Sequence, residues 1–286
     1  MPSELNHPSG LDIEDARRVI EAALAEDVGS GDITSCAVIP EDVHFHGAMR
    51  ARHAMVIAGL PVAREVFRMV VPEASFRAVV AEGDAVHAGA VLAEIEGPAR
   101  GLLTAERTAL NLLQILSGIA TATREYVERI RGTSCILLDT RKTIPGMRKL
   151  SKYATRCGGA RNHRRGLFDA VLIKDNHIAV CGSISEAVRK AKLAAPGRVT
   201  IEVECDTLAQ VSEAVEAGID MVLLDNMSVD ELRQAVALVG RRAKTEASGG
   251  VTLETVRAIA ESGVDFVSVG RITQSAPAVD IGLDWS

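Results

Sequence analysis

Hydrophobic and polar residues follow two different patterns along the chain, one before and one after about residue 133. The stretch LDIEDARRVIEAALAED, residues 11–27, has the spacing of an amphipathic helix, which GSGDITS then ends. Residues 43–97 consist mostly of short strand-like runs separated by glycine, with a helix predicted at 60–71. Residues 104–130 predict one long helix or two in succession. The first third is therefore expected to mix helices with short strands.

Two residues near the start of that long helical stretch have candidate roles. Thr104 could cap the helix, because its hydroxyl can accept a hydrogen bond from an exposed amide of the first turn. Arg107 would then lie in the first turn, and spacing alone favours a solvated surface arginine there.

After residue 133, short apolar runs alternate regularly with helical segments. This order predicts parallel strands joined by helical crossovers, as in a (β/α) barrel or a reduced form of one. The expected strands are residues 135–139, 170–175, 199–204, 221–225, 242–246 and 266–270, and the helices between them include 183–195, 207–218, 228–240 and 252–263.

Each expected strand is followed by polar residues or glycine. In barrels of this type the carboxyl ends of the strands meet on one face, where active sites are built. A series of polar strand ends is therefore the strongest functional signal in the chain. The residues at these ends are Thr140, Arg141, Lys142, Lys174, Glu204, Asp225, Ser248, Gly249, Gly250 and Gly270.

The last two strand ends are typical of a phosphate site. Glycines in Ser248-Gly249-Gly250 and at Gly270 would let backbone amides approach phosphate oxygens. A helix expected to start at Thr252 would add its positive amino end.

Glu204 and Asp225 end adjacent strands and could hold Mg²⁺ together, directly or through water. An ion pair of one or both carboxylates with Lys174 or an arginine is an equally good interpretation. Lys174 itself could form a Schiff base if its amine were neutral. The surrounding acids favour a charged lysine that binds an anion instead.

Charge changes the picture at one place in the chain. The formal net charge is −6, yet residues 139–165 contain nine cations against one acid, Asp139. With a pI of 5.7 and 3% aromatic residues, the chain does not resemble a nucleic-acid binder. Within the segment, Arg141, His163 and Arg164 are the candidates for gripping carboxylates. Arg148, Lys149 and Lys152 are expected to lie on a solvated helix face.

The remaining composition favours a cytoplasmic protein. Five scattered cysteines without a C-x-x-C pair are typical of buried thiols in a reducing compartment. The sequence shows neither a secretory signal nor an apolar run long enough to span a membrane.

The central block DTRKTIPGMRKLSKYATRCGGARNHRRGLFDAVLIKDNHI resembles the signature of the quinolinate phosphoribosyltransferases. IEVECDTL, MVLLDNM, EASGGVTLETV and DFVSVGRIT continue the resemblance in order, and EDVGSGDITS and GLLTAERTALNLLQILSGIATAT extend it to the amino-terminal part.

The resemblance implies an N-terminal α/β sandwich domain and a C-terminal incomplete, seven-stranded α/β barrel. We expect the sandwich at residues 1–115, with the tail at about 276–286 packing back on it, and the barrel at 116–275. The implied reaction transfers phosphoribose from phosphoribosyl pyrophosphate to quinolinate. Its products are nicotinate mononucleotide, pyrophosphate and CO₂, in de novo NAD biosynthesis.

The resemblance also implies roles for individual residues. Family members form dimers or multiples of dimers, and Arg107 matches the arginine that reaches into the partner's active site. Mg²⁺ is implied near Glu204 and Asp225. The catalytic set is Lys142, Lys174, Glu204 and Asp225, and the substrate-binding set adds Arg107, Thr140, Arg141, His163, Arg164, Ser248, Gly249, Gly250 and Gly270.

Three positions depart from the family pattern. Ala160 replaces a usual glycine, Arg271 is bulkier than usual, and Gln274 stands where histidine is expected. Three rival interpretations are a relative that uses another acceptor, such as the molybdenum-transport-associated members, a Schiff-base aldolase using Lys174, and a nucleic-acid module. The intact R-N-H-R-R-G-L and T-R-K segments argue against the first.

Overall fold

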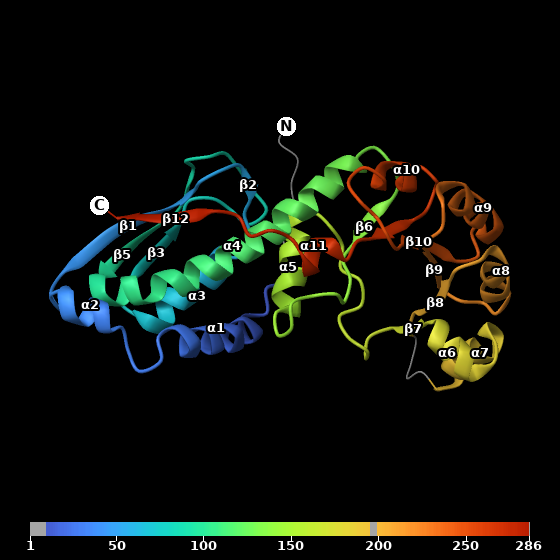
Figure 1. The fold of residues 1–286 in the computed structure, drawn as a ribbon, viewed down its shortest axis with the longest axis horizontal. Coiled ribbons are helices and arrows are strands. Elements are labelled where there is room, and N and C mark those ends of the chain that lie inside the picture. The colour runs from blue at the N-terminus through green and yellow to red at the C-terminus, as the bar shows by residue number, and fades with distance from the viewer. Residues whose placement is uncertain (1–9, 195–198, 286) are drawn as a thin grey trace. The chain divides into compact units, whose positions relative to one another are not determined.

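The computed structural model describes residues 10–194 and 199–285. These residues form two compact units (Figure 1). The sandwich unit contains the chain up to Arg124, residues 143–159 and the end of the chain from Ile272. The barrel unit contains residues 125–142 and 160–271.

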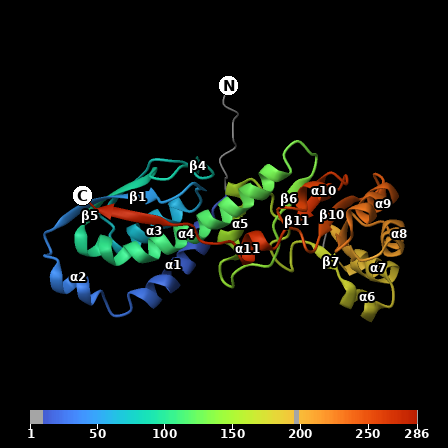
Figure 2. The ribbon, with the colours of Figure 1, turned by 45° about the horizontal axis from the view of Figure 1, so that its top comes forward.

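The sandwich unit is built on a four-stranded antiparallel sheet in the order β12-β1-β5-β3. Its strands are β1 (His44–Ala51), β3 (Ser75–Ala78), β5 (Val91–Pro98) and β12 (Ile281–Trp285). A two-stranded sheet pairs β2 (Met55–Val56) with β4 (Ala85–Val86). The helices are α1 (Ile13–Asp27), α2 (Ile33–Val38), α3 (Leu60–Val70), α4 (Ala99–Arg129) and α5 (Arg148–Gly158). In Figures 1 and 2, α1, α3 and α4 lie on one side of the larger sheet.

The C-terminal tail belongs to the sandwich unit. Strand β12 pairs antiparallel with β1, which brings Leu283 opposite Met49. The Gln114 side chain on α4 donates a hydrogen bond of 2.9 Å to the carbonyl of Ile281. A side chain at Gly118 would lie 2.1 Å from the Pro277 carbonyl, so only glycine allows this close approach.

The expected boundary between residues 115 and 116 falls inside α4, a single helix of 31 residues. Apolar side chains of α4 such as Leu113 and Leu116 are buried in the sandwich core, which keeps the helix with that unit as far as Arg124. The chain also returns to the sandwich unit at 143–159, which the sequence did not indicate.

Thr104 does not cap α4, because the helix begins five residues earlier, at Ala99. Its hydroxyl lies within the helix, 2.8 Å from the Arg100 carbonyl and 3.1 Å from the Asp32 carboxylate. Arg107 consequently lies well inside the helix rather than in its first turn.

The barrel unit contains six parallel strands in the order β6-β11-β10-β9-β8-β7. All six predicted strands are confirmed. They are β6 (Ile136–Leu138), β7 (Val171–Ile173), β8 (Ile201–Cys205), β9 (Met221–Asp225), β10 (Lys244–Ser248) and β11 (Phe266–Ser268). Strand β10 continues through Ser248, two residues beyond the predicted end. The seventh strand that the resemblance implies is not found among the described residues, where Leu138 and Arg161 form an isolated parallel bridge.

Helices alternate with these strands. They are α6 (Asp175–Cys181), α7 (Ile184–Ala194), α8 (Leu208–Glu216), α9 (Val229–Val239) and α10 (Val256–Ala260). The next helix, α11 (Arg271–Gln274), belongs to the sandwich unit from Ile272 onwards. Figures 1 and 2 show α7, α8 and α9 in a row along one side of the strands. Among the described residues, no helix combines the length and the apolar composition that a membrane crossing requires.

The helix expected to start at Thr252 begins at Val256 instead. The Thr252 amide donates to the Thr255 hydroxyl at 2.9 Å, so these residues form a turn before the helix. The sequence predicted that the positive amino end of a helix starting at Thr252 would help to bind a phosphate. Because α10 starts at Val256 and has only five residues, no helix begins at that position.

A buried carboxylate joins two helices of the sandwich unit. Glu65 on α3 is 6% exposed and accepts hydrogen bonds from Arg17 on α1 at 2.6 Å and from Arg68 at 2.7 Å. Hydrogen bonding to Arg68, opposed by burial and assisted by Arg17, lowers the pKa of Glu65 to about 2.

We predict that Glu65→Gln destabilises the protein at neutral pH but not near pH 2. The pKa of Glu65 is lower in the folded state than its ordinary value of 4.5. The stabilisation is therefore present above pH 4.5 and is lost as the pH falls towards 2, and we expect it to be about 2 kcal/mol. Urea unfolding at several pH values measures it, with exposed Glu21→Gln on α1 as the control. An equal difference at pH 7 and pH 2.5 would contradict this account.

Candidate active site

The parallel sheet brings the predicted strand ends to one edge. Asp225 lies opposite Ser248 in the pairing of β9 with β10, and Glu204 lies opposite Leu223 in the pairing of β8 with β9. Thr140–Lys142 follow β6, Lys174 follows β7 and Gly270 follows β11 at the same edge. Residues from six strands therefore share the carboxyl edge of the sheet.

Lys174 and Glu204 form an ion pair between Nζ and Oε2, with the Glu204 side chain mostly buried. Asp225 lies close enough for its ionisation to be affected by Glu204. Burial, followed by the charges of Glu204 and Asp206, raises the pKa of Asp225. The Asn226 side chain donates to Asp225 at 2.7 Å. A cation near the two carboxylates would relieve their repulsion, so this donor set fits Mg²⁺.

The SGG turn has the backbone conformation that the phosphate hypothesis needs. Gly249 and Gly250 have φ values of +88° and +60°, which side chains rarely adopt. A Cβ at Gly249 would lie 2.2 Å from the Asn226 Oδ1. Backbone and amide groups therefore approach closely at the ends of β9 and β10.

Gly270 places the end of β11 against the residues that follow β6. A Cβ there would lie 2.9 Å from the Lys142 side chain and 3.5 Å from the Thr140 hydroxyl. The Lys142 amide also donates to this hydroxyl at 3.0 Å. Thr140, Lys142 and Gly270 are thus neighbours, as a common phosphate or diphosphate site requires.

The cations of segment 139–165 are divided between the two units. Arg148, Lys149, Lys152 and Arg156 belong to the sandwich unit, whereas Arg141, Lys142, Arg161, Arg164 and Arg165 belong to the barrel unit. Lys152 is 2% exposed, so its assignment to a solvated helix face is wrong. Burial of α5 over most of its surface explains the difference.

Asp139, the one acid of the segment, anchors the loop formed by residues 160–165. Its carboxylate is fully buried and accepts hydrogen bonds from the His163 amide at 2.8 Å and the Asn162 side chain at 2.6 Å. The Asp139 amide donates to the Arg161 carbonyl at 3.2 Å. The cationic loop is therefore attached directly to the end of β6.

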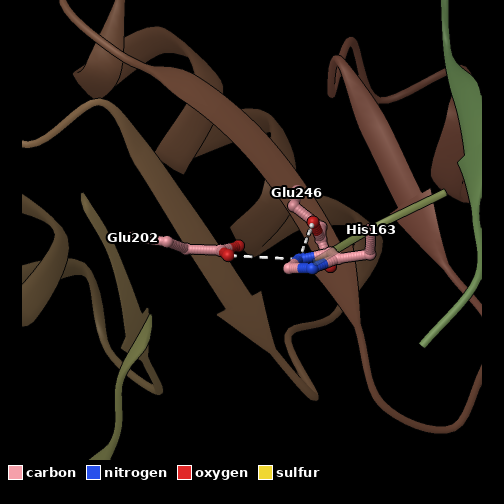
Figure 3. Close-up of side chains that lie close together, drawn as sticks. All are labelled: His163, Glu202 and Glu246. Atoms are coloured by element: carbon pink, nitrogen blue, oxygen red, sulfur yellow. Dashed lines mark ion pairs between the residues drawn. The ribbon is translucent and has the colours of Figure 1, made fainter. Parts of the chain in front are cut away.

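His163 points into a cluster of two buried glutamates (Figure 3). Its Nε2 lies 3.1 Å from the Glu202 carboxylate and 3.2 Å from that of Glu246. Glu202 and Glu246 are 2% and 1% exposed, and carboxylate oxygens of both have no hydrogen-bond partner. Burial lowers the pKa of His163, but the two carboxylates outweigh it and raise the pKa overall. Burial also raises the pKa of Glu202.

Arg164 lies beside this cluster. Burial, followed by the charge of Arg141, lowers the pKa of Arg164, while Glu202 acts in the opposite direction. The two guanidinium groups are therefore near one another with a buried carboxylate close by. Such a pair suits a ligand that carries more than one carboxylate.

A cavity of about 480 Å³ opens beside the cationic loop. Its lining includes residues 161–165 and Glu202, together with Thr200, Met221 and Phe266 at the amino ends of strands. Lys174, Glu204 and Asp225 do not line it. His163 and Arg164 thus lie at a cavity formed by the cationic loop and the barrel strands.

Arg107 lies in the sandwich unit, at a second cavity of about 330 Å³ with Asp27, Asp32 and Thr104. Of the positions that depart from the family pattern, Ala160 is buried and directly follows Gly159, whose φ is +103°.

Two family models together match most of the chain. Residues 32–117 match the model described as quinolinate phosphoribosyl transferase, N-terminal domain, and residues 119–284 match the C-terminal domain. The chain belongs to the quinolinate phosphoribosyltransferase family.

Similar proteins cover nearly the whole chain. The probable nicotinate-nucleotide pyrophosphorylase (carboxylating) of Bacillus subtilis is 43% identical over 94% of this chain and 92% of its own. The enzyme of that name from Mycobacterium leprae is 44% identical over 96% and 99%. The solved nicotinate-nucleotide pyrophosphorylase of Francisella tularensis has a TM-score of 0.92 at 39% identity and covers 98% of this chain and 99% of its own.

Membership of the quinolinate phosphoribosyltransferase family leaves the Schiff-base interpretation of Lys174 without support. The ion pair with Glu204 stabilises a charged ammonium, whereas a Schiff base needs a neutral amine. Glu204 can form this ion pair and still be one of the two carboxylates that could hold Mg²⁺.

Sequence reasoning did not identify Glu202 or Glu246 as site residues. A signal was available in IEVE, because Glu202 and Glu204 are two apart on one strand and therefore face the same side. Glu246 likewise shares a face with Ser248 on β10.

We predict that Asp139→Asn lowers the free energy of unfolding by about 2 kcal/mol, because a buried acceptor of two hydrogen bonds is replaced by a group with fewer acceptor sites. Amide hydrogen exchange in residues 160–165 should speed up with it. Exposed Asp206→Asn is the control and should change stability by less than about 0.5 kcal/mol. Unchanged exchange in the loop would show that Asp139 does not anchor it.

Proposed function

We propose that the protein transfers phosphoribose from phosphoribosyl pyrophosphate to quinolinate and releases nicotinate mononucleotide, pyrophosphate and CO₂. The observation that carries this proposal is the loop of residues 160–165, which is anchored by the buried Asp139 and places Arg164 at a cavity, with Arg141 close enough to lower the pKa of Arg164. Family membership and the names of the similar enzymes support the same reaction.

The substrate quinolinate carries two carboxylates on adjacent ring carbons. Arg141, His163, Arg164 and Lys174 form the proposed pocket for them, with Arg107 from a partner subunit. Guanidinium groups hold a carboxylate through two parallel hydrogen bonds, which fixes the plane of the pyridine ring as well as its position. The pocket therefore aims the ring nitrogen at the ribose carbon.

The second substrate is held by its phosphates. Ser248, Gly249, Gly250 and Gly270 are proposed to bind the 5-phosphate, and Thr140 and Lys142 to lie near the diphosphate. Close approach of Lys142 to Gly270 supports a shared phosphate region. Glu204 and Asp225 would hold Mg²⁺, which when bound neutralises charge on the diphosphate.

The chemistry follows from these positions. The ring nitrogen forms a bond to the ribose carbon as the bond to pyrophosphate breaks, and the ring nitrogen becomes positively charged. That charge stabilises the electron pair left on the neighbouring carbon when CO₂ leaves, and a proton then replaces the carboxylate. The protein needs no nucleophile of its own, because it acts by positioning and by charge.

The proposal also includes a homodimer or a multiple of dimers, a cytoplasmic location, and no nucleic-acid or membrane partner. The acidic pI of 5.7 and the division of the basic segment between two units support the exclusion of nucleic acid.

Product analysis tests the reaction directly. The protein is mixed with phosphoribosyl pyrophosphate, Mg²⁺ and either quinolinate or nicotinate. We expect nicotinate mononucleotide and CO₂ from quinolinate and no product from nicotinate. A folded sample that uses nicotinate, or neither acceptor, would overturn the proposal.

We predict that Arg164→Ala lowers kcat/KM for quinolinate by about 100-fold or more, because a bidentate contact to a carboxylate is lost. The adjacent Arg165→Ala is the matched control. Its side chain is 71% exposed and pairs with Asp169 at 3.6 Å, so its removal should change the kinetics by less than about twofold. Equal losses in the two variants would argue against a specific role for Arg164.

A mixing experiment tests the contribution of Arg107 across a dimer. Arg107→Ala and Arg164→Ala should each be inactive alone. Heterodimers formed from both contain one intact site, so an equal mixture should recover about a quarter of wild-type activity. No recovery, despite subunit exchange shown by mass spectrometry, would place Arg107 outside the partner's site.

A further inference from the structure

Of the cluster of His163, Glu202 and Glu246, only the histidine has a role in the reaction outlined above. The three side chains come from the cationic loop, β8 and β10 (Figure 3). Glu202 and Glu246 are 2% and 1% exposed, and burying two carboxylates costs free energy. We therefore ask what their contacts contribute to the site.

Both ring nitrogens of the imidazole have polar partners. Its Nδ1 accepts a hydrogen bond of 2.7 Å from the backbone amide of Arg164. This hydrogen bond favours the neutral ring with its hydrogen on Nε2, and so it opposes the two carboxylates, which raise the pKa of His163. Nε2 lies 3.1 Å from the Glu202 carboxylate and 3.2 Å from that of Glu246, so the ring is paired with both.

The same geometry argues against a metal ion in this cluster. The ligand atoms of the three residues lie within 4.8 Å of one another, which would suit a cation. A histidine that binds metal through Nε2 carries its hydrogen on Nδ1 and donates it to an acceptor. Here Nδ1 faces an N–H donor instead.

We propose that Glu202 and Glu246 are positioning residues for the dicarboxylate substrate, acting through His163. The two carboxylates form ion pairs with the ring at Nε2, and Nδ1 accepts a hydrogen bond from the backbone amide of Arg164. His163 is then a link between the barrel interior and Arg164, with both ring nitrogens already engaged. This inference rests on the proposed function and changes the role of His163 from substrate contact to support.

The electrostatics of the site support the same arrangement. The charge of Arg141 lowers the pKa of Arg164, and the charges of Glu202 and Asp169 act in the opposite direction. Asp139 holds the amide of His163, so the loop is fixed on both sides of the imidazole. The buried glutamates thus keep the pocket assembled before quinolinate arrives.

The test compares two substitutions at Glu246. Glu246→Ala removes one of the two carboxylates paired with Nε2 and should raise the KM for quinolinate about tenfold, while the KM for phosphoribosyl pyrophosphate changes less than about twofold. Glu246→Gln keeps an acceptor oxygen and should stay within about threefold of wild type. If Glu246→Ala does not fold, Glu246→Leu fills the volume without offering an acceptor and gives the same contrast.

A double-mutant cycle with His163→Ala separates action through the histidine from independent effects. If Glu246 acts through His163, adding Glu246→Ala to His163→Ala should raise the quinolinate KM by less than about twofold more. Three results would each overturn the inference. The first is a full addition of the two variants' effects on the quinolinate KM, and the second is an equal change in the KM values for quinolinate and phosphoribosyl pyrophosphate. The third is a stoichiometric metal ion in the wild-type protein that Glu246→Ala loses. Absence of quinolinate turnover in the wild-type protein, assayed in parallel, would instead reject the proposed function.

Discussion

Three carboxylates buried in the barrel unit hold the loop on which the proposed substrate pocket depends. Asp139, Glu202 and Glu246 have almost no exposure to solvent. A buried charge is tolerated only when nearby groups compensate it, and here those groups are an amide, an imidazole and a guanidinium of residues 162–164. The cationic loop is therefore drawn towards the barrel interior instead of lying on the surface as a solvated basic patch.

This constraint explains why so many cations occur together in an acidic chain. Segment 139–165 serves two structural purposes, because residues 143–159 return to the sandwich unit and the loop after them enters the barrel unit. Lys149 pairs with Asp12, the N-cap residue of α1, at 2.9 Å, and Arg156 donates to the Gly10 carbonyl at 3.0 Å. Only part of the positive charge is left for a substrate, in keeping with a small dicarboxylate.

The sequence predicted the barrel strands well because each is a short apolar run that ends in a polar residue. The spacing of apolar residues could not locate helix ends at which side-chain hydrogen bonds replace the backbone hydrogen bonds of the helix. Thr252 and Thr255 bond to each other and delay α10, and α4 begins before the threonine that resembled a cap. The two units and the return of the C-terminal tail were predicted, but the return of α5 to the sandwich unit was not, because it depends on contacts between residues far apart in the chain.

The residues of the candidate site also divide into those that the local sequence predicts and those that meet only in the folded chain. Strand-end residues such as Lys174, Glu204 and Asp225 could be chosen from the sequence, because the carboxyl edge of a parallel sheet collects them. Glu202 and Glu246 were not chosen, since a glutamate inside an apolar strand gives no sign of its partner. The partner is His163, which is 39 residues from one and 83 from the other and meets them only in the folded barrel.

The central claim is that the anchored loop recognises two carboxylates at once. Equilibrium titration of the free protein with quinolinate and with nicotinate, at the same ionic strength, tests it most directly. A second carboxylate held by a guanidinium contributes on the order of 2–3 kcal/mol, so quinolinate should bind about 100-fold more tightly than nicotinate. Equal affinity for the two acids would contradict the account.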